Sequence, residues 1–262
     1  MSISVAVIGV GRWGINHVRV LSELRGAWVD SLYVDDTNAE RAREVAERYR
    51  CDMWFASVDE LLSRAKDLDA AVIAVPTVFH HRVASALAEK LDLLVEKPLA
   101  ATPEEGLDIV RRAARAGRVL MVGHIERFNP VVHEAKYLAR ELGGPLAIEA
   151  KRVGPGPARE YTLNLGVAHD LLVHDIDVSN FILEELPQSV YSVAFTQEGF
   201  PYEVEVQALY RYPDGATSFL TASWRSEPHY KHRSLSIRTA SATIRADYIL
   251  CLLYTSPSPR DR

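Results

Sequence analysis

The chain has 262 residues, of which 48% are hydrophobic and 25% are charged, and its net charge is −5. These values are typical of a soluble globular protein, and the absence of a dense Lys/Arg cluster argues against a nucleic-acid partner. No apolar run approaches the roughly 18 to 20 residues of a membrane span, and the N-terminus lacks the pattern of a secretory signal. Cys51 and Cys251 form neither a disulfide framework nor a metal-binding spacing, so we expect a cytoplasmic protein without a membrane partner.

The first half of the chain alternates strand-like and helix-like segments. Five short apolar runs predict strands, at residues 3–8, 29–34, 70–75, 93–95 and 119–122. Helical patterns lie between them, at about residues 12–24, 39–50, 79–90 and 102–116, with a shorter one after Ser57. Asn38, Ser57 and Thr102 occupy helix N-cap positions. This alternation is typical of an α/β fold, so we predict a doubly wound parallel sheet over residues 1–122.

The pattern changes after about residue 123. Helices are expected from Asn129 to about residue 143 and from about 167 to 183, with a strand at 146–153 between them. Further strands are expected at residues 189–196, 203–212, 216–224, 234–238 and 242–248. Residues 123–250 are therefore predicted to form a second, α+β domain on a largely antiparallel open sheet.

The last stretch, CLLYTSPSPRDR at residues 251–262, fits neither pattern. Proline, serine and arginine dominate it, and we expect it to contribute nothing to the fold. It resembles the translation of a sequencing adapter joined in frame to a truncated gene, and the alternative is a natural disordered tail. On the first interpretation Cys251 is foreign and the second domain is incomplete.

A glycine-rich motif, Gly9-Val10-Gly11-Arg12-Trp13-Gly14, directly follows the first strand and opens a helix. In that position G-x-G-x-x-G is a fingerprint of dinucleotide binding in a Rossmann domain. The first glycine permits the tight turn, the second lets the pyrophosphate approach the backbone, and the third lets the helix pack on the strand. The alternative is an ordinary glycine-rich turn.

An acidic pair, Asp35-Asp36, stands at the end of the second strand, where a carboxylate binds the adenosine ribose hydroxyls. A carboxylate there would repel the 2′-phosphate of NADP, so NAD is the predicted cofactor. The alternative is a pair of solvated surface acids.

Glu96-Lys97-Pro98 ends the strand at residues 93–95. Ligands of doubly wound sheets bind beyond the carboxyl ends of the strands, so Lys97 could donate a hydrogen bond to a substrate hydroxyl. Pro98 would fix the turn, and a cis bond is one way to do so. A surface Lys–Glu pair that caps the strand explains the same residues equally well.

A second polar group lies in HDLLVHDID, residues 169–177. On an α-helix Asp170, His174 and Asp177 fall at positions i, i+4 and i+7, on one stripe. A histidine can take a hydroxyl proton near neutral pH, and a carboxylate one turn away can orient it. Acids placed for the helix dipole, or a metal site, are the alternatives, but no fourth metal ligand is evident and no metal is predicted.

These motifs together resemble the glucose–fructose oxidoreductase/inositol dehydrogenase (Gfo/Idh/MocA) family of NAD(P)-dependent sugar dehydrogenases. The resemblance covers about residues 3–250 and implies that Lys97, Asp170 and His174 form the catalytic set, with His174 as the acid/base. It places Asp36 rather than Asp35 at the ribose. It also implies a cofactor-binding set made of the following residues: Gly9, Gly11, Arg12, Trp13, Gly14, Asp35, Asp36, Pro76, Thr77, His80 and Glu96.

A closer likeness within the family rests on VGHIERFNPVV, residues 122–132, and VHDIDV, residues 173–178. These segments resemble the UDP-N-acetylglucosamine 3-dehydrogenases and related nucleotide-sugar enzymes. By that resemblance Glu126, Arg127, Asn129 and Asp177 would face the substrate. Family members usually run longer than this chain, and their second-domain sheet often serves as a dimer face, which implies a homo-oligomer.

The sequence therefore predicts NAD-dependent oxidation of a sugar hydroxyl, with the 3-hydroxyl of a UDP-N-acetylhexosamine as the expected target. Another sugar or inositol is an alternative substrate. A glycosidase that oxidises the 3-hydroxyl only transiently is a rival from another reaction class, and it would release no net NADH. A nucleotide-binding regulator is a third interpretation, but such a protein would not need Lys97, Asp170 and His174 together.

Overall fold

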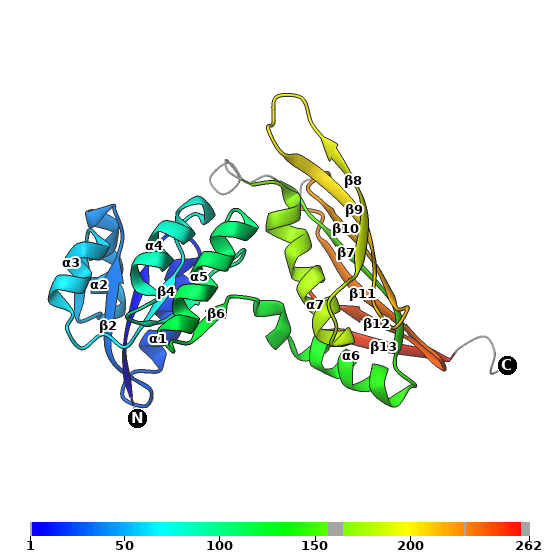
Figure 1. The fold of residues 1–262 in the computed structure, drawn as a ribbon, viewed down its shortest axis with the longest axis horizontal. Coiled ribbons are helices and arrows are strands. Elements are labelled where there is room, and N and C mark those ends of the chain that lie inside the picture. The colour runs from blue at the N-terminus through cyan, green and yellow to red at the C-terminus, as the bar shows by residue number, and fades with distance from the viewer. Residues whose placement is uncertain (1, 157–164, 228, 258–262) are drawn as a thin grey trace. The chain divides into compact units, whose positions relative to one another are not determined.

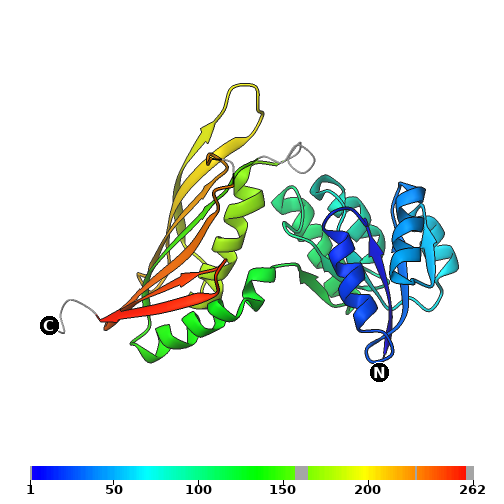
Figure 2. The same cartoon turned by 180° about the vertical axis from the view of Figure 1, so that it is seen from behind.

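The computed structural model of the protein describes residues 2–156, 165–227 and 229–257 (Figures 1 and 2). The chain divides into two compact units, Met1–Gly123 and His124–Arg262. We call them unit 1 and unit 2. Each unit is built on a β-sheet of its own, six strands in unit 1 and seven in unit 2.

A parallel sheet with strand order β3-β2-β1-β4-β5-β6 forms unit 1. Its strands are β1 (Ile3–Ile8), β2 (Val29–Asp35), β3 (Met53–Phe55), β4 (Ala70–Ile73), β5 (Asp92–Val95) and β6 (Leu120–Val122). The strand order reverses between β1 and β4. Doubly wound sheets bind their ligands beside the carboxyl ends of the strands at such a point.

Helices cover both faces of this sheet, as the sequence predicts for parallel strands (Figures 1 and 2). They are α1 (Gly14–Glu23), α2 (Ala39–Tyr49), α3 (Val58–Arg64), the short 3₁₀ turn η1 (Thr77–Phe79), α4 (His80–Leu87) and α5 (Pro103–Arg115). Successive residues of β1 alternate between two hydrophobic clusters: Val5 and Val7 belong to one, and Ala6 and Ile8 belong to the other. The predicted doubly wound α/β fold is confirmed.

Local signals placed the helix starts correctly but missed one strand. The side chains of Asn38, Ser57 and Thr102 each accept a backbone hydrogen bond from the residue three positions on, which confirms the three predicted N-caps. The overlooked strand is β3, which lies at the sheet edge and pairs with β2. It has only three residues, too few for a periodic pattern to emerge.

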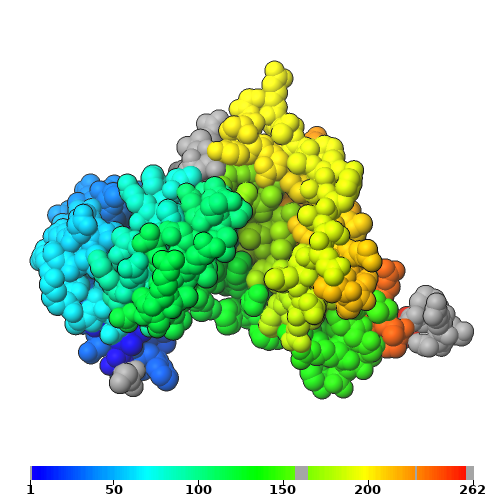
Figure 3. Space-filling model, in the orientation of Figure 1, coloured from blue at the N-terminus to red at the C-terminus, as the bar shows by residue number. Residues whose placement is uncertain are grey.

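Unit 2 contains a sheet with order β13-β12-β11-β7-β10-β9-β8. Its strands are β7 (Pro145–Val153), β8 (Ser189–Thr196), β9 (Glu203–Arg211), β10 (Thr217–Ser223), β11 (His232–Thr239), β12 (Ala242–Asp247) and β13 (Leu252–Pro257). Only the β7–β10 pair is parallel, so the predicted, largely antiparallel sheet is confirmed. The β8–β9 hairpin, yellow in the figures, extends beyond the rest of unit 2 (Figures 1 and 3).

Two long helices, α6 (Pro130–Glu141) and α7 (Val173–Leu183), lie on one face of this sheet (Figures 1 and 2). The 3₁₀ turn η2 (Ile125–Phe128) precedes α6, and the π turn η3 (Ala168–Leu172) precedes α7. Ile148, Ala150 and Arg152 alternate along β7 as buried residues, so they face the helices. The opposite sheet face exposes large apolar side chains, most of all on β8.

Two expectations for unit 2 are wrong in part. Residues 252–257 form β13, which pairs antiparallel with β12, although we expected this stretch to contribute nothing to the fold. The error arose because backbone pairing needs no apolar periodicity, and Leu253 supplies one apolar contact to the core. The helix expected at 167–183 is also not α-helical throughout, because a π turn occupies its first part. The remaining residues of the last stretch, 258–262, lie outside the described part of the chain.

Candidate active site

The glycine-rich turn after β1 lies where the strand order of unit 1 reverses. A Cβ atom on Gly9 would lie 2.8 Å from the Val75 backbone nitrogen, and one on Gly14 would lie 1.8 Å from the Gly9 carbonyl oxygen. Neither position has room for a side chain. At Gly11, by contrast, no described atom lies within 4 Å of a Cβ, so the backbone there is open to an approaching pyrophosphate. The turn therefore fits a dinucleotide.

The two acids after this turn differ in environment. Asp36 is 8% exposed; its Oδ2 accepts a hydrogen bond from the Val10 backbone nitrogen at 3.1 Å and lies 3.7 Å from the Arg41 guanidinium. It thus supports the glycine turn from the position that contacts a ribose in dinucleotide-binding domains. Asp35 is buried, and this burial, with the charges of Asp36 and Glu60, raises its pKa to about 7. Asp36 is therefore the better ribose candidate.

Glu96, Lys97 and Pro98 follow β5, and the Lys97–Pro98 peptide bond is cis, as considered from the sequence. Oε1 of Glu96 accepts a hydrogen bond from the Trp13 indole at 2.6 Å and lies 2.7 Å from Nε2 of His17. Its Oε2 accepts a hydrogen bond from the Lys97 backbone nitrogen at 3.2 Å. Two predicted cofactor residues, Trp13 and Glu96, therefore contact each other. The sequence analysis missed His17, which lies one turn into α1.

His80 begins α4 and is 1% exposed. Its Nδ1 lies 2.9 Å from the Pro98 carbonyl oxygen, and its Nε2 lies 2.9 Å from that of Val75. Burial lowers the pKa of this ring, although the nearby carbonyls oppose the shift. The imidazole thus bridges the loops that follow β4 and β5. Pro76 and Thr77, also predicted at the cofactor, form the loop and 3₁₀ turn between Val75 and His80.

In unit 2 the predicted catalytic residues lie at the junction of the π turn and α7. Asp170 is in the π turn, and His174 is in the first turn of α7. The carboxylate of Glu203 on β9 accepts a hydrogen bond from the Ala168 backbone nitrogen at 3.0 Å, which secures the start of this helix. A Cβ on Gly166 would lie 2.0 Å from the same carboxylate, so a larger residue there would displace the Glu203 side chain. Single π turns inside α-helices occur frequently at functional sites.

A buried ion-pair network joins α7 to the sheet behind these residues. Arg152 on β7 donates hydrogen bonds to both oxygens of Asp175, at 3.2 and 2.9 Å, and to Glu126 at 2.7 Å. Arg152 and Asp175 are each 1% exposed. Burial alone would lower the pKa of Arg152, but the carboxylates of Asp175 and Glu126 outweigh it and raise that pKa above its ordinary value. The network fixes the helix that carries His174.

The four residues predicted to face the substrate have partners within unit 2. Arg127 donates two hydrogen bonds of 2.7 Å to Asp177, and Asp177 is only 8% exposed. Glu126 pairs with Arg152. Asn129 caps α6: its Oδ1 accepts a hydrogen bond from the Val131 backbone nitrogen at 3.1 Å, and its amide donates to Glu126 at 3.3 Å. The Arg127–Asp177 pair joins η2 to α7, Glu126 joins η2 to Arg152 on β7, and Asn129 caps α6.

Two charged residues in these networks were not identified from the sequence. Arg152 is an isolated arginine in a strand pattern, and Asp175 lies between two residues that were noticed. Their partners are 23 to 26 positions apart in the chain, so no local pattern links them. The one available signal was a charged residue at a position of β7 where the alternation calls for an apolar side chain.

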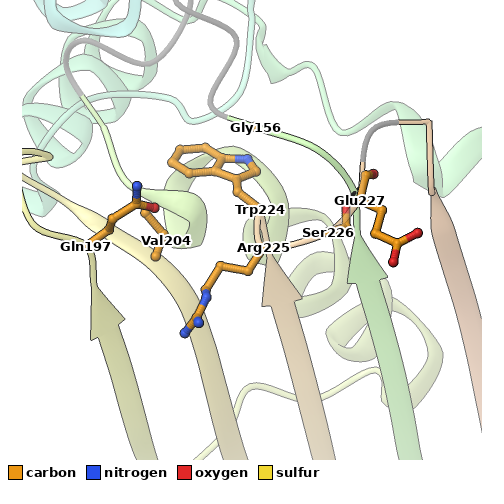
Figure 4. A pocket seen from close by; sticks show the side chains of 7 residues that line it. All are labelled: Gly156, Gln197, Val204, Trp224, Arg225, Ser226 and Glu227. Carbon is orange, nitrogen blue, oxygen red and sulfur yellow. Dashed lines mark hydrogen bonds between the residues drawn. The ribbon is translucent and has the colours of Figure 1, made fainter.

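A cavity of about 490 Å³ lies in unit 2 at the end of β10 (Figure 4). Seven residues line it: Gly156, Gln197, Val204, Trp224, Arg225, Ser226 and Glu227. Trp224 and Arg225 point to opposite sides of the strand end (Figure 4). None of the seven was predicted as a site residue.

Within the part of the chain that the structure describes, His, Cys, Asp and Glu side chains form no group of three or more that could hold a metal ion. The helices of the same residues are too short or too polar for any of them to cross a membrane.

Comparison with known proteins identifies relatives of both units. Residues 3–124 match the oxidoreductase family with an NAD-binding Rossmann fold, and residues 135–245 match the Gfo/Idh/MocA C-terminal domain. The chain is 36% identical over 192 residues to UDP-N-acetylglucosamine 3-dehydrogenase of Acidithiobacillus ferrooxidans, covering 71% of this chain and 56% of that protein. It is 35% identical to inositol 2-dehydrogenase of Mycolicibacterium smegmatis, covering 71% and 54%. The chain thus spans about half the length of these curated relatives.

Solved structures agree with these matches. A structure of the A. ferrooxidans UDP-N-acetylglucosamine 3-dehydrogenase matches with a TM-score of 0.84 and 28% identity, covering 100% of this chain and 82% of that one. Levoglucosan dehydrogenase in complex with NADH and L-sorbose matches with a TM-score of 0.88, covering 100% and 78%, and at 21% identity it supports the fold alone. The chain therefore belongs to the Gfo/Idh/MocA oxidoreductase family, and residues 3–124 are its NAD-binding domain of Rossmann fold.

Proposed function

We propose that the protein oxidises a hydroxyl group of a sugar with NAD, and that its substrate is a UDP-N-acetylhexosamine oxidised at the 3-hydroxyl. The observation that carries the proposal is the arrangement at the carboxyl edge of the unit 1 sheet. The glycine turn after β1 abuts Val75 after β4, and Lys97 follows the neighbouring strand β5. A dinucleotide site and a lysine donor thus share one edge of one sheet.

In this mechanism the residues of the chain position the hydroxyl and move its proton. Lys97 donates a hydrogen bond to the hydroxyl oxygen and stabilises the negative charge that develops there. A ring nitrogen of His174 takes the hydroxyl proton, and Asp170 orients the substrate or the imidazole. Bound NAD would supply the hydride acceptor. Gly9, Gly11 and Gly14 would hold its pyrophosphate.

The sugar nucleotide is favoured by the relative from A. ferrooxidans, which is named a UDP-N-acetylglucosamine 3-dehydrogenase. Inositol is a second candidate, because relatives of nearly equal identity are named inositol 2-dehydrogenases. The two candidates differ in size and charge, since only the first carries a diphosphate. They can therefore be separated by a direct substrate comparison.

The test is a panel assay for net NADH formation with UDP-N-acetylglucosamine, UDP-N-acetylgalactosamine, myo-inositol and scyllo-inositol. We expect turnover with a UDP-sugar to exceed that with the inositols, and NAD to be preferred over NADP. Faster oxidation of an inositol would transfer the assignment to the second candidate. Cleavage of a glycoside without net NADH would instead indicate the glycosidase.

We also propose that the exposed face of the unit 2 sheet mediates self-association. Tyr191, Leu209 and Phe219 lie opposite one another on three neighbouring strands and form an exposed apolar row. Exposed apolar patches of this kind commonly mark protein interfaces. Light scattering of the wild type and of Leu209→Glu tests this proposal. We expect the variant to form smaller assemblies, with a lower molecular mass in solution. An unchanged molecular mass would count against self-association through this face.

A further inference from the structure

Glu96 precedes the proposed catalytic lysine, and its carboxylate is surrounded by hydrogen-bond donors. The Trp13 indole and the His17 ring contact Oε1 at 2.6 and 2.7 Å, and the Lys97 backbone nitrogen donates to Oε2 at 3.2 Å. The residue is 9% exposed. A surface acid that merely ended the strand would have no need of three partners.

These partners come from two separate segments. Trp13 is the N-cap residue of α1 and belongs to the glycine-rich turn, and His17 lies one turn further along the same helix. Lys97 follows β5, which is separated from β1 by β4 in the sheet. The carboxylate therefore bridges the start of the dinucleotide-binding helix and the main chain at Lys97.

Charge and packing make this bridge firm. Burial acts to raise the pKa of Glu96, but the hydrogen bonds from His17 and Trp13 outweigh it and keep the pKa below its ordinary value. The group is thus ionised at neutral pH, and hydrogen bonds to an ionised carboxylate are the stronger kind. A Cβ on Gly123 would lie 3.1 Å from the carboxylate, so a larger residue after β6 would press on it.

We propose that Glu96 is a positioning residue that fixes the Lys97 main chain relative to the dinucleotide loop through Trp13 and His17. The inference rests on the proposed role of Lys97 in the oxidation. It gives Glu96 a role besides the direct cofactor contact that the sequence predicts. On this account Glu96 acts on the rate of the chemical step, because small displacements of a reacting group are costly in enzymes.

Four variants separate this role from a merely structural one. Glu96→Ala removes the carboxylate, and Glu96→Gln retains an acceptor oxygen of the same reach. Trp13→Phe removes only the indole N–H donor. Trp28→Phe is the matched control, because Trp28 is 65% exposed and lies before β2, away from the cluster. The measurements are amide exchange of the Lys97 backbone nitrogen, kcat and KM for the sugar, NAD affinity and the unfolding midpoint.

We expect Glu96→Ala to speed exchange of the Lys97 amide by about tenfold or more and to lower kcat by about tenfold to a hundredfold, with KM within about twofold. Glu96→Gln should recover part of both losses, Trp13→Phe should show a smaller change in the same direction, and Trp28→Phe should match the wild type. If Glu96→Ala does not fold, amide exchange and kcat of Glu96→Gln and Trp13→Phe are compared with those of the wild type instead.

Unchanged exchange of the Lys97 amide in folded Glu96 and Trp13 variants would overturn the inference. So would a loss of kcat that follows the unfolding midpoint and is not recovered by glutamine. If the wild type oxidises no sugar, the proposed function fails, but the exchange measurement still decides whether Glu96 positions Lys97.

Discussion

The two units hold their candidate site residues by different means. In unit 1 the site depends on backbone geometry. Gly9 and Gly14 lie where no side chain would fit, and acidic side chains accept hydrogen bonds from nearby main-chain nitrogens. In unit 2 it depends on charge pairs: the buried Arg152 is bound to Asp175 and Glu126, and the half-exposed Arg127 is bound to Asp177. The first arrangement suits a fixed dinucleotide loop, and the second fixes one helix on a sheet.

This difference predicts opposite sensitivities to mutation. A buried ion pair adds little to stability when compared with an apolar pair, but removing one partner leaves an uncompensated charge in the interior. Exposed pairs such as Arg19–Glu23 on α1 contribute little in either case. We therefore expect the removal of one charged side chain to destabilise unit 2 more than unit 1.

The largest expected effect is that of Arg152→Met. It leaves the carboxylates of Asp175 and Glu126 without their buried cation, so we expect a loss of about 3 to 5 kcal/mol in the free energy of unfolding. Urea denaturation measures this loss. The double variant Arg152→Met/Asp175→Leu should recover much of it, and Arg19→Met should cost less than about 1 kcal/mol. If Arg152→Met lowered the free energy of unfolding as little as Arg19→Met does, the two units would not differ in this respect.

The same difference explains which parts of the candidate site could be predicted from the sequence. Glycine spacing and strand ends are local signals, so the turn at Gly9 to Gly14, the acid Asp36 and the position of Lys97 after a strand could be predicted. The partners of Arg152 are distant in the chain, and nothing local tells a buried Asp175 from a surface acid. The resemblance to nucleotide-sugar enzymes predicted Glu126, Arg127 and Asp177 at the substrate, and only the structure shows their charged partners within unit 2.

The next effect concerns Asp35, a buried charge in unit 1 that lacks the compensation found in unit 2. Its pKa is raised to about 7 from the ordinary value of 3.8, so between these values the folded state holds a proton that the unfolded state has lost. Stability must therefore fall as the pH rises through that window. Asp35→Asn, which does not titrate, should be more stable than the wild type by about 2 to 4 kcal/mol at pH 8 and similar to it at low pH.

Denaturant titrations of both proteins at several pH values test this expectation. The sign of the difference is diagnostic, because a carboxylate whose pKa a paired cation has lowered would give the opposite pH dependence. Equal stabilities at pH 8 would mean that Asp35 is ionised in the folded protein without cost.

A smaller effect is expected for cofactor choice at Asp36. Asp36→Asn keeps an oxygen that can accept the Val10 hydrogen bond but removes the negative charge beside Arg41. We expect the preference for NAD over NADP to narrow by about tenfold, since the repulsion of a 2′-phosphate is lost. Binding titrations with both dinucleotides measure the change. A wild type that binds NADP more tightly than NAD would refute the assignment of Asp36.

Our main proposal is that Lys97 and His174 both act in the oxidation. The most direct test is steady-state turnover of Lys97→Met and His174→Asn with the best substrate of the panel, together with their NAD affinities. The account predicts that each substitution lowers kcat by about a hundredfold or more, the usual scale for a positioned acid–base group, while NAD affinity changes little. Near-normal NAD-linked oxidation in either variant would contradict it.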